Sequence, residues 1–160
     1  MKKQHAINQM KLELESRSVN ESFARAVVSA FAAQLDPTVE ELTDIKTSVS
    51  EAVTNCIVHA YPAQCGKIFL TAAVFSGGTL RVQVRDRGCG IADIAQARQP
   101  LYSSLGEERA GLGFAVMESF MDKLRVRSRP GAGTTVVMEK HIQGRSLRDG
   151  SSAAPQQQKA

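Results

Sequence analysis

Apolar and polar residues alternate strictly in several short stretches of this 160-residue chain. Such alternation is typical of strands that bury only one face, and it predicts five strands, over residues 10–15, 67–75, 79–86, 124–128 and 135–141. Between the second and third strands, Ser76-Gly77-Gly78 supplies the flexible residues of a tight turn and predicts a hairpin.

Helical spacing of apolar residues predicts two longer helices between the first and second strands. Asn20 is placed to cap the first, whose apolar stripe holds Phe23, Ala26, Val27, Ala30 and Phe31. The second begins at the capping box Thr38-x-x-Glu41 and ends near Pro62, with a stripe of Leu42, Ile45, Val49, Ala52, Val53 and Cys56. Two shorter helices, over 92–98 and 112–123, flank a polar loop over 99–110.

The predicted elements follow the order β-α-α-β-β-α-α-β-β. Because the strands are polar on one face, this order predicts a two-layer α/β sandwich with helices on one side of a mixed, mostly antiparallel sheet. Residues 1–143 are expected to form one domain, and the Ser-, Ala- and Gln-rich stretch 144–160 a disordered tail.

Composition excludes several classes of protein. No apolar run approaches 18 residues and no signal-peptide pattern is present, so no membrane association is expected. Three cysteines without metal-binding spacing indicate a reduced, cytoplasmic protein. The net charge of +4 comes from the chain ends, and the arginines of the predicted strands are accompanied by few aromatics. We therefore expect no direct contact with nucleic acid.

One acid stands on the wrong face of its strand for a surface residue. Period-two geometry places Asp86 in line with Val82 and Val84, which face the core. A buried carboxylate is costly unless a fixed donor bonds to it, and Gly88 and Gly90 allow a backbone to approach a ligand closely. This combination predicts a pocket for a planar donor group such as a nucleobase amine.

Three further patterns carry candidate chemistry. Glu51 and Asn55 share one stripe of the long helix, where a carboxylate can act as a base and an amide oxygen can bind Mg²⁺. Gly111 and Gly113 open a helix whose free N–H groups favour anions, and Arg109 is near enough to clamp a phosphate. Thr134 and Thr135 begin the last strand, where a hydroxyl can assist base recognition. Each pattern alone is also compatible with an ordinary solvated helix, a helix start or a turn.

Taken in chain order, the patterns E-x-x-x-N, D-x-G-x-G, G-x-G and G-T-T resemble the nucleotide-binding boxes of one superfamily. It comprises the gyrase, heat-shock chaperone, histidine kinase and mismatch-repair ATPases, which share the Bergerat-type ATP-binding fold. Longer strings narrow the resemblance to the sporulation anti-sigma F factors, which are serine protein kinases, over about residues 8–142. Those strings are Asn20-Glu-Ser-Phe-Ala-Arg25, Gln34-Leu-Asp-Pro-Thr38, Glu41-Leu-Thr-Asp-Ile-Lys-Thr47, Val49-Ser-Glu-Ala-Val-Thr-Asn55 and Ala97-Arg-Gln-Pro-Leu101.

The resemblance implies a role for each candidate residue. Glu51 would be the catalytic base and Asn55 the Mg²⁺ ligand. Asp86 would bind the adenine amino group of ATP or ADP, with Thr134 or Thr135 assisting. The remaining candidates are the pocket-shaping Gly88 and Gly90, the phosphate-binding Gly111 and Gly113, the γ-phosphate sensor Arg109 and the partner contact Arg25.

The same resemblance implies the partners. They are a sigma factor, an anti-anti-sigma protein phosphorylated on serine, and a second copy of the chain in a homodimer. Two departures are His59-Ala60-Tyr61, where His-Gly-Tyr is usual, and the stretch 103–109, which lacks an expected lysine. The alternatives are a general-stress anti-sigma kinase, a nucleotide-dependent binding module without transfer activity, and a detached histidine-kinase catalytic domain.

Overall fold

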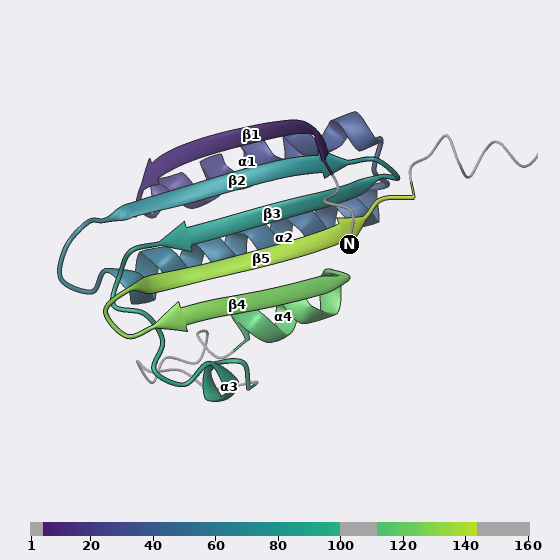
Figure 1. The fold of residues 1–160 in the computed structure, drawn as a ribbon. Coiled ribbons are helices and arrows are strands. Elements are labelled where there is room, and N and C mark those ends of the chain that lie inside the picture. The colour runs from purple at the N-terminus through teal and green to yellow at the C-terminus, as the bar shows by residue number, and fades with distance from the viewer. Residues whose placement is uncertain (1–4, 100–111, 144–160) are drawn as a thin grey trace, which may run out of the picture.

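A single five-stranded sheet, with its helices on one face, organises the chain (Figure 1). The computed structural model describes residues 5–99 and 112–143. The strands are β1 (Ala6–Glu15), β2 (Lys67–Phe75), β3 (Thr79–Asp86), β4 (Lys123–Arg129) and β5 (Gly133–His141), in the spatial order β1-β2-β3-β5-β4. The predicted two-layer sandwich is confirmed. The sheet is antiparallel at every described pairing rather than mixed, because β5 inserts between β3 and β4 and runs opposite to both.

The helices have the predicted order, with small differences at their ends. They are α1 (Val19–Ala32), a 3₁₀ turn η1 (Ala33–Leu35), α2 (Val39–Asn55), a π-helical turn η2 (Cys56–Ala60), α3 (Ile94–Ala97) and α4 (Gly113–Phe120). The predicted capping box is present, since Thr38 Oγ1 accepts from the Glu41 amide at 3.2 Å while the Thr38 amide donates to Glu41 Oε2 at 2.8 Å.

The buried stripe of α1 differs from the predicted one. Ala24, Val28 and Ala32 are the buried residues, whereas Phe23 is 48% exposed. These small side chains let α1 lie close to α2, so the larger ring is turned outward. The predicted cap was also wrong, because α1 starts after Ser18 and the side-chain amide of Asn20 donates instead to the Glu15 carbonyl at 2.8 Å.

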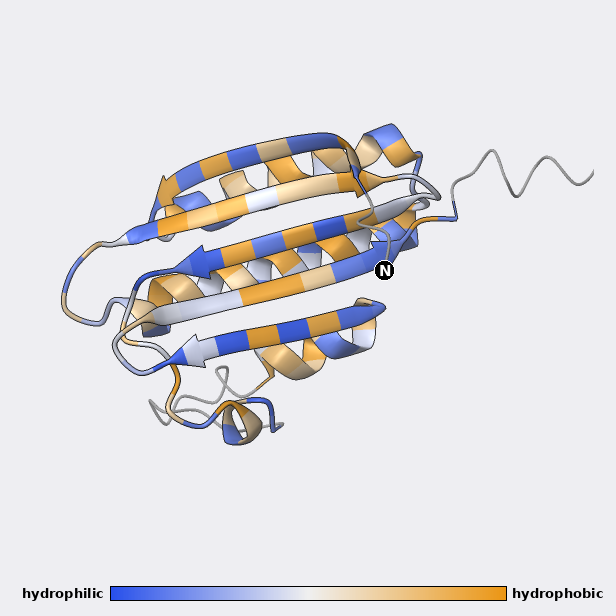
Figure 2. Ribbon diagram, viewed as in Figure 1, coloured by the Kyte–Doolittle hydropathy of each residue, from blue (hydrophilic) through white to orange (hydrophobic). Residues whose placement is uncertain are grey.

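The core lies between the inner face of the sheet and helices α1, α2 and α4. Its fully buried members come from every layer, and Figure 2 shows the apolar positions alternating with polar ones along β3 and β4. The predicted stripe of α2 is confirmed, with only Leu42 partly exposed. Among the described residues, no helix is long and apolar enough to span a bilayer. The core therefore fixes α2 across the inner face of the sheet and brings its C-terminal end to the end of β3.

Candidate functional site

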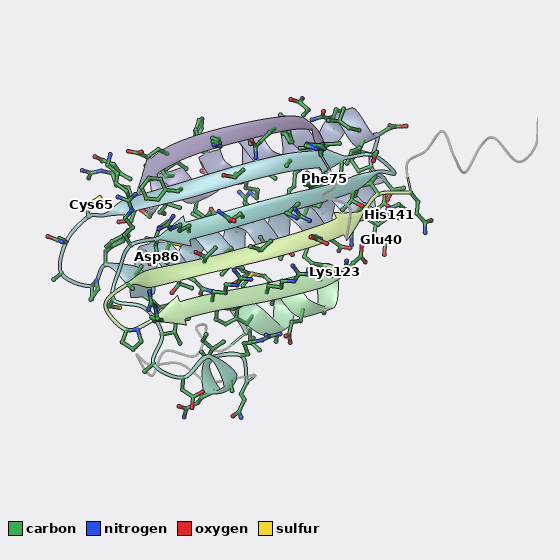
Figure 3. All side chains as sticks on the ribbon, in the orientation of Figure 1. Glu40, Cys65, Phe75, Asp86, Lys123 and His141 are labelled. Atoms are coloured by element: carbon green, nitrogen blue, oxygen red, sulfur yellow. The ribbon has the colours of Figure 1, made fainter. Side chains whose placement is uncertain are left out.

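A cavity of about 360 Å³ opens at the end of β3, where Asp86 lies (Figure 3). Its walls come from the last turns of α2, the segment after β3, the first turn of α4 and the start of β5. The residues that carry its chemistry are Asn55, Cys56, Asp86, Phe114, Thr134 and Val136. Four segments that are distant in the sequence therefore converge on one concave site.

Asp86 is the polar centre of this cavity and is only 4% exposed. One carboxylate oxygen, Oδ1, accepts hydrogen bonds from the backbone amides of Gly88 at 2.9 Å and Thr134 at 3.2 Å. Among the described residues, the other oxygen, Oδ2, accepts only a weak bond from the Cys56 thiol at 3.6 Å. Asp86 is therefore buried as predicted, held by fixed donors at one oxygen and retaining acceptor capacity at the other.

The glycines around Asp86 bring backbone segments close together, and Gly90 also lines the cavity. A Cβ on Gly88 would lie 2.1 Å from the Ala60 carbonyl oxygen, and one on Gly133 would lie 2.2 Å from the Asp86 carbonyl oxygen. Gly90 has φ +73°, and a Cβ there would lie 2.1 Å from the Arg129 carbonyl oxygen. Gly88 and Gly90 thus shape the pocket by allowing three backbone segments to pack closely.

Cys56 is a second polar group inside the cavity, although sequence reasoning assigned it only to the apolar stripe of α2. Burial, followed by the charge of Asp86 and the hydrogen bond to it, raises the pKa of the Cys56 thiol well above its ordinary value. The thiol therefore stays protonated at neutral pH and donates a hydrogen bond to Asp86 rather than acting as a nucleophile. It orients the carboxylate oxygen that remains available to a ligand.

Much of the remaining wall of the cavity is apolar. Val84 and Val136 lie side by side on β3 and β5, and Ile91 and Phe114 contribute further carbon surface. A flat apolar space with one oriented acceptor matches a planar heteroaromatic ring that bears an amino group. Of the predicted residues, Thr134 lines this space. Thr135 does not, because successive residues of β5 point to opposite faces and its side chain lies on the outer face of the sheet.

Glu51, Asn55 and Gly113 form a second group at the mouth of the cavity. A Cβ on Gly113 would lie 3.1 Å from Glu51 Oε2 and 3.5 Å from the side-chain amide of Asn55. The N-terminus of α4 thus abuts both candidate side chains, and Gly113 leaves room beside them. Burial, and to a lesser extent the negative charge of Glu21, raises the pKa of the Glu51 carboxyl.

Arg25 lies on α1 beside this group rather than in the cavity. Its guanidinium Nη1 is 3.4 Å from Glu21 Oε1 and 3.4 Å from Ser50 Oγ, and the Ser50 hydroxyl donates to Glu21. Because Ser50 directly precedes Glu51, the Arg25 surface is one residue removed from the candidate base. Arg109 and Gly111 lie outside the described residues.

The described residues offer few ligands for the Mg²⁺ ion of a magnesium–nucleotide complex. Within residues 5–99 and 112–143, no three His, Cys, Asp or Glu side chains are grouped closely enough to hold a metal ion. Asn55 offers one amide oxygen at the cavity mouth, and Mg²⁺ commonly takes few protein ligands, with water and phosphate supplying the rest. His59 also lines the cavity, and its carbonyl accepts from the Cys89 thiol at 3.1 Å.

Comparisons with known proteins agree with this geometry. The family model of the histidine kinase-like ATPase domain matches residues 13–140. The chain is 58% identical over 136 residues to an anti-sigma F factor of Thermoanaerobacter sp. (strain X514), covering 84% of this chain and 94% of the relative. It is 56% identical over 139 residues to the anti-sigma F factor of Pasteuria penetrans, covering 85% and 92%.

Solved structures share the fold at lower identity. The structure of the RsbU and RsbW domains of a Mycobacterium tuberculosis protein matches with a TM-score of 0.62 at 21% identity, over 84% of this chain and 32% of that one. A blue-light activated histidine kinase domain from Erythrobacter litoralis matches with a TM-score of 0.53 at 23% identity, over 79% of this chain and 63% of that one.

Proposed function

Because this chain belongs to the anti-sigma F factors, within the family of histidine kinase-like ATPase domains, we propose that it inhibits a sigma factor and phosphorylates an anti-anti-sigma protein on serine. Membership in a family of ATPase domains implies nucleotide binding. The proposal adds the serine specificity, the Mg²⁺ requirement, the cytoplasmic location and the two protein partners.

The observation that carries the nucleotide site is that the two carboxylate oxygens of Asp86 have different partners. Backbone amides donate to Oδ1, while within the described part of the chain Oδ2 accepts only from the Cys56 thiol and lies at the wall of a largely apolar cavity. The amino group of adenine would donate to Oδ2, and the purine ring would fill the space between Val84, Val136 and Phe114.

The transfer step is assigned to the group at the cavity mouth. Glu51 would accept the proton of the attacking serine hydroxyl, and its raised pKa brings it closer to neutral pH, where a general base is most effective. Asn55 would hold Mg²⁺, which neutralises charge on the transferred phosphoryl group when bound. Gly111 and Gly113 would receive phosphates and Arg109 would respond to the terminal one.

The partners are assigned to the α1 side. Arg25 lies beside Ser50 and Glu21, so a protein that docks there sits next to the candidate base. Exposed apolar side chains near α1 offer a surface for the proposed homodimer. Ile7 on β1 is 70% exposed and Val19 on α1 is 68% exposed. Light scattering that shows only monomer would contradict the dimer.

The decisive experiment measures binding and transfer separately. Purified protein is titrated with ATP by calorimetry and then incubated with labelled ATP, Mg²⁺ and a candidate anti-anti-sigma protein. Glu51→Ala should retain ATP binding and lose phosphoserine formation, because only the base is removed. Undiminished transfer would contradict the assignment of Glu51. ATP binding without any phosphoserine in the wild type would instead identify a nucleotide-dependent binding module.

A further inference from the structure

The face of the sheet that points away from the helices is rich in arginine side chains. A shallow hollow of about 260 Å³ is lined by Arg81 and Gln83 on β3, Thr135 and Val137 on β5, and Arg125 and Arg127 on β4. Arg85 on β3 pairs with Thr135 next to it. We call this set of seven residues the arginine trough. It lies on the opposite face from the Asp86 cavity, and the nucleotide site does not use it.

The strand register defines the shape of the trough. Thr135 is paired with Arg85 on one side and with Arg127 on the other, and Val137 is paired in the same way with Gln83 and Arg125. Two strand spacings separate β3 from β4, so the walls stand roughly 10 Å apart at the backbone. The floor consists of a hydroxyl and a small apolar side chain. A channel of this width accommodates one extended chain.

The charge at one end of the trough is balanced, and the charge in the rest is not. Glu139 bonds to Arg81 at 2.7 Å and lies 3.3 Å from Lys123, so both of those cations have a partner. Arg85, Arg125 and Arg127 make no ion pair with any described residue, and all three are exposed. Three guanidinium groups on the two walls therefore have no anionic partner among the described residues.

We propose that the arginine trough binds an extended acidic segment of a partner protein. Residues two apart on a strand lie about 6.7 Å apart, which is also the spacing of alternate side chains in an extended peptide. Carboxylates at alternate positions of such a peptide would meet Arg125 and Arg127 in register and face Arg85 across the floor. Each guanidinium can then bond a carboxylate through two parallel N–H groups.

Other occupants fit the trough less well. A nucleic-acid duplex is wider than the channel, and single strands need exposed aromatic platforms. The described rings on this face, Phe69 and Phe75, lie on β2 and are covered by Arg87 at 4.7 Å and Arg81 at 4.4 Å. The chain's own residues 144–160 carry three basic residues and one acid, so their charge has the wrong sign.

A second copy of the chain is also a poor complement. The acids at outward strand positions are Glu13, Glu15 and Glu139, and each already bonds a cation of its own chain, Lys67, Arg17 or Arg81. Two sheets facing each other would therefore present one set of unpaired arginines to another. Sheet-to-sheet packing of two copies would therefore leave these arginines without described carboxylates to bond, which favours a partner protein as their source.

The test uses fluorescence anisotropy with the full chain and a labelled nine-residue peptide in which glutamate alternates with threonine. We expect the peptide to bind, its glutamine counterpart to bind at least tenfold more weakly, and Arg125→Glu/Arg127→Glu to reduce binding at least tenfold. The matched control is Lys11→Glu/Lys67→Glu, which makes the same charge change on the same face of the sheet over β1 and β2 and should alter binding less than twofold.

Four outcomes would overturn the proposal. Equal binding of the glutamate and glutamine peptides would show that carboxylates are not recognised, and equal losses in both double variants would show a general charge effect. Tighter binding of an oligothymidine than of the acidic peptide would assign the trough to nucleic acid. A change of oligomeric state on light scattering in the Arg125/Arg127 variant would assign it to a second copy.

Discussion

Asp86 and Glu139 are two buried acids of the same sheet, and their surroundings differ in a way that separates function from stability. Asp86 is 4% exposed on the inner face at the end of β3, and Glu139 is 8% exposed on the outer face of β5. Both occupy positions at which an unpartnered carboxylate would be costly.

The two acids obtain their partners differently. Glu139 is bonded by the mobile side chains of Arg81 and Lys123, which use both of its oxygens. Asp86 is held by backbone amides of Gly88 and Thr134 at one oxygen only. A carboxylate that is fixed by rigid donors and retains one oxygen facing a cavity is suited to bind a ligand, whereas one enclosed by cations serves the fold.

The rigid setting of Asp86 depends on close backbone contacts, and Gly133→Ala tests that dependence. A Cβ on Gly133 would lie 2.2 Å from the Asp86 carbonyl oxygen, so the β5 start and the Asp86 loop must separate. We expect a loss of about 3 kcal/mol in the free energy of unfolding, from strain and overpacking together. Thermal or urea unfolding measures it.

Gly77→Ala is the matched control for that variant. Gly77 has φ +84° and Gly133 φ +81°, but nothing lies within 4 Å of a Cβ at Gly77. The control should therefore lose only about 1 kcal/mol, which is the conformational part of the effect. Equal losses in the two variants would show that the packing of the cavity end contributes nothing.

Asp86→Asn tests the free oxygen directly. The amide oxygen can still accept from Gly88 and Thr134, so the fold is retained, but an NH₂ group replaces Oδ2 and opposes the donor of adenine. We expect ATP affinity to fall about 30-fold or more, because a bond to a charged acceptor is worth about 2 kcal/mol. In the calorimetric titration, Glu139→Gln should leave the affinity unchanged. Unaltered binding by Asp86→Asn would remove the basis of the nucleotide site.

Much of this comparison could be predicted from the sequence because it depends on local periodicity. Alternation along Thr79–Asp86 placed Asp86 on the buried face, and the structure confirms that strand with the same bounds. The stripe of α2 was predicted for the same reason, since a long amphipathic helix repeats its signal over many turns.

The remainder depends on tertiary packing that no single stretch encodes. The stripe of α1 was misassigned because Phe23 is large and apolar but faces outward, while Ala24 contacts α2. Cys56 as a partner of Asp86 requires α2 and β3 to be placed together, 30 residues apart in sequence. The grouping of Thr135 with Thr134 failed on a rule that the sequence does contain, because neighbours on a strand face opposite sides.

Glu139→Gln tests the other side of the comparison and should affect only stability. Burial alone would raise the pKa of Glu139, but the hydrogen bonds and charges of Arg81 and Lys123 outweigh it and lower that pKa below its ordinary value. The ionised form therefore stabilises the fold above the ordinary carboxyl range, and this contribution is lost as the pH falls through the lowered pKa.

We expect Glu139→Gln to lose about 1 kcal/mol at neutral pH, since the side chains of Arg81 and Lys123 are 40% and 62% exposed and solvent weakens both ion pairs. The difference from the wild type should shrink in acid, as measured by urea unfolding across pH. If the difference in the free energy of unfolding stayed constant down to the lowest pH, the charge on Glu139 would not be what stabilises its contacts with Arg81 and Lys123.

The smallest expected effect concerns Glu21, which connects the α1 surface to the candidate base. Burial and then the charge of Glu21 raise the pKa of Glu51, so Glu21→Gln should lower that pKa and let Glu51 ionise at lower pH. In a plot of the phosphoryl-transfer rate against pH, the fall in rate on the acidic side (the acid limb) should then move toward lower pH. The displacement should be small because Arg25 lies 3.4 Å from Glu21 and offsets part of its charge.

Glu40→Gln, 11 residues before Glu51 and about 17 Å along the helix, is the control that should leave the acid limb unmoved. A carbon-13 titration of the Glu51 carboxyl reads the same shift without catalysis, and an unchanged pKa in Glu21→Gln would show that partner docking on α1 cannot reach the base through this charge.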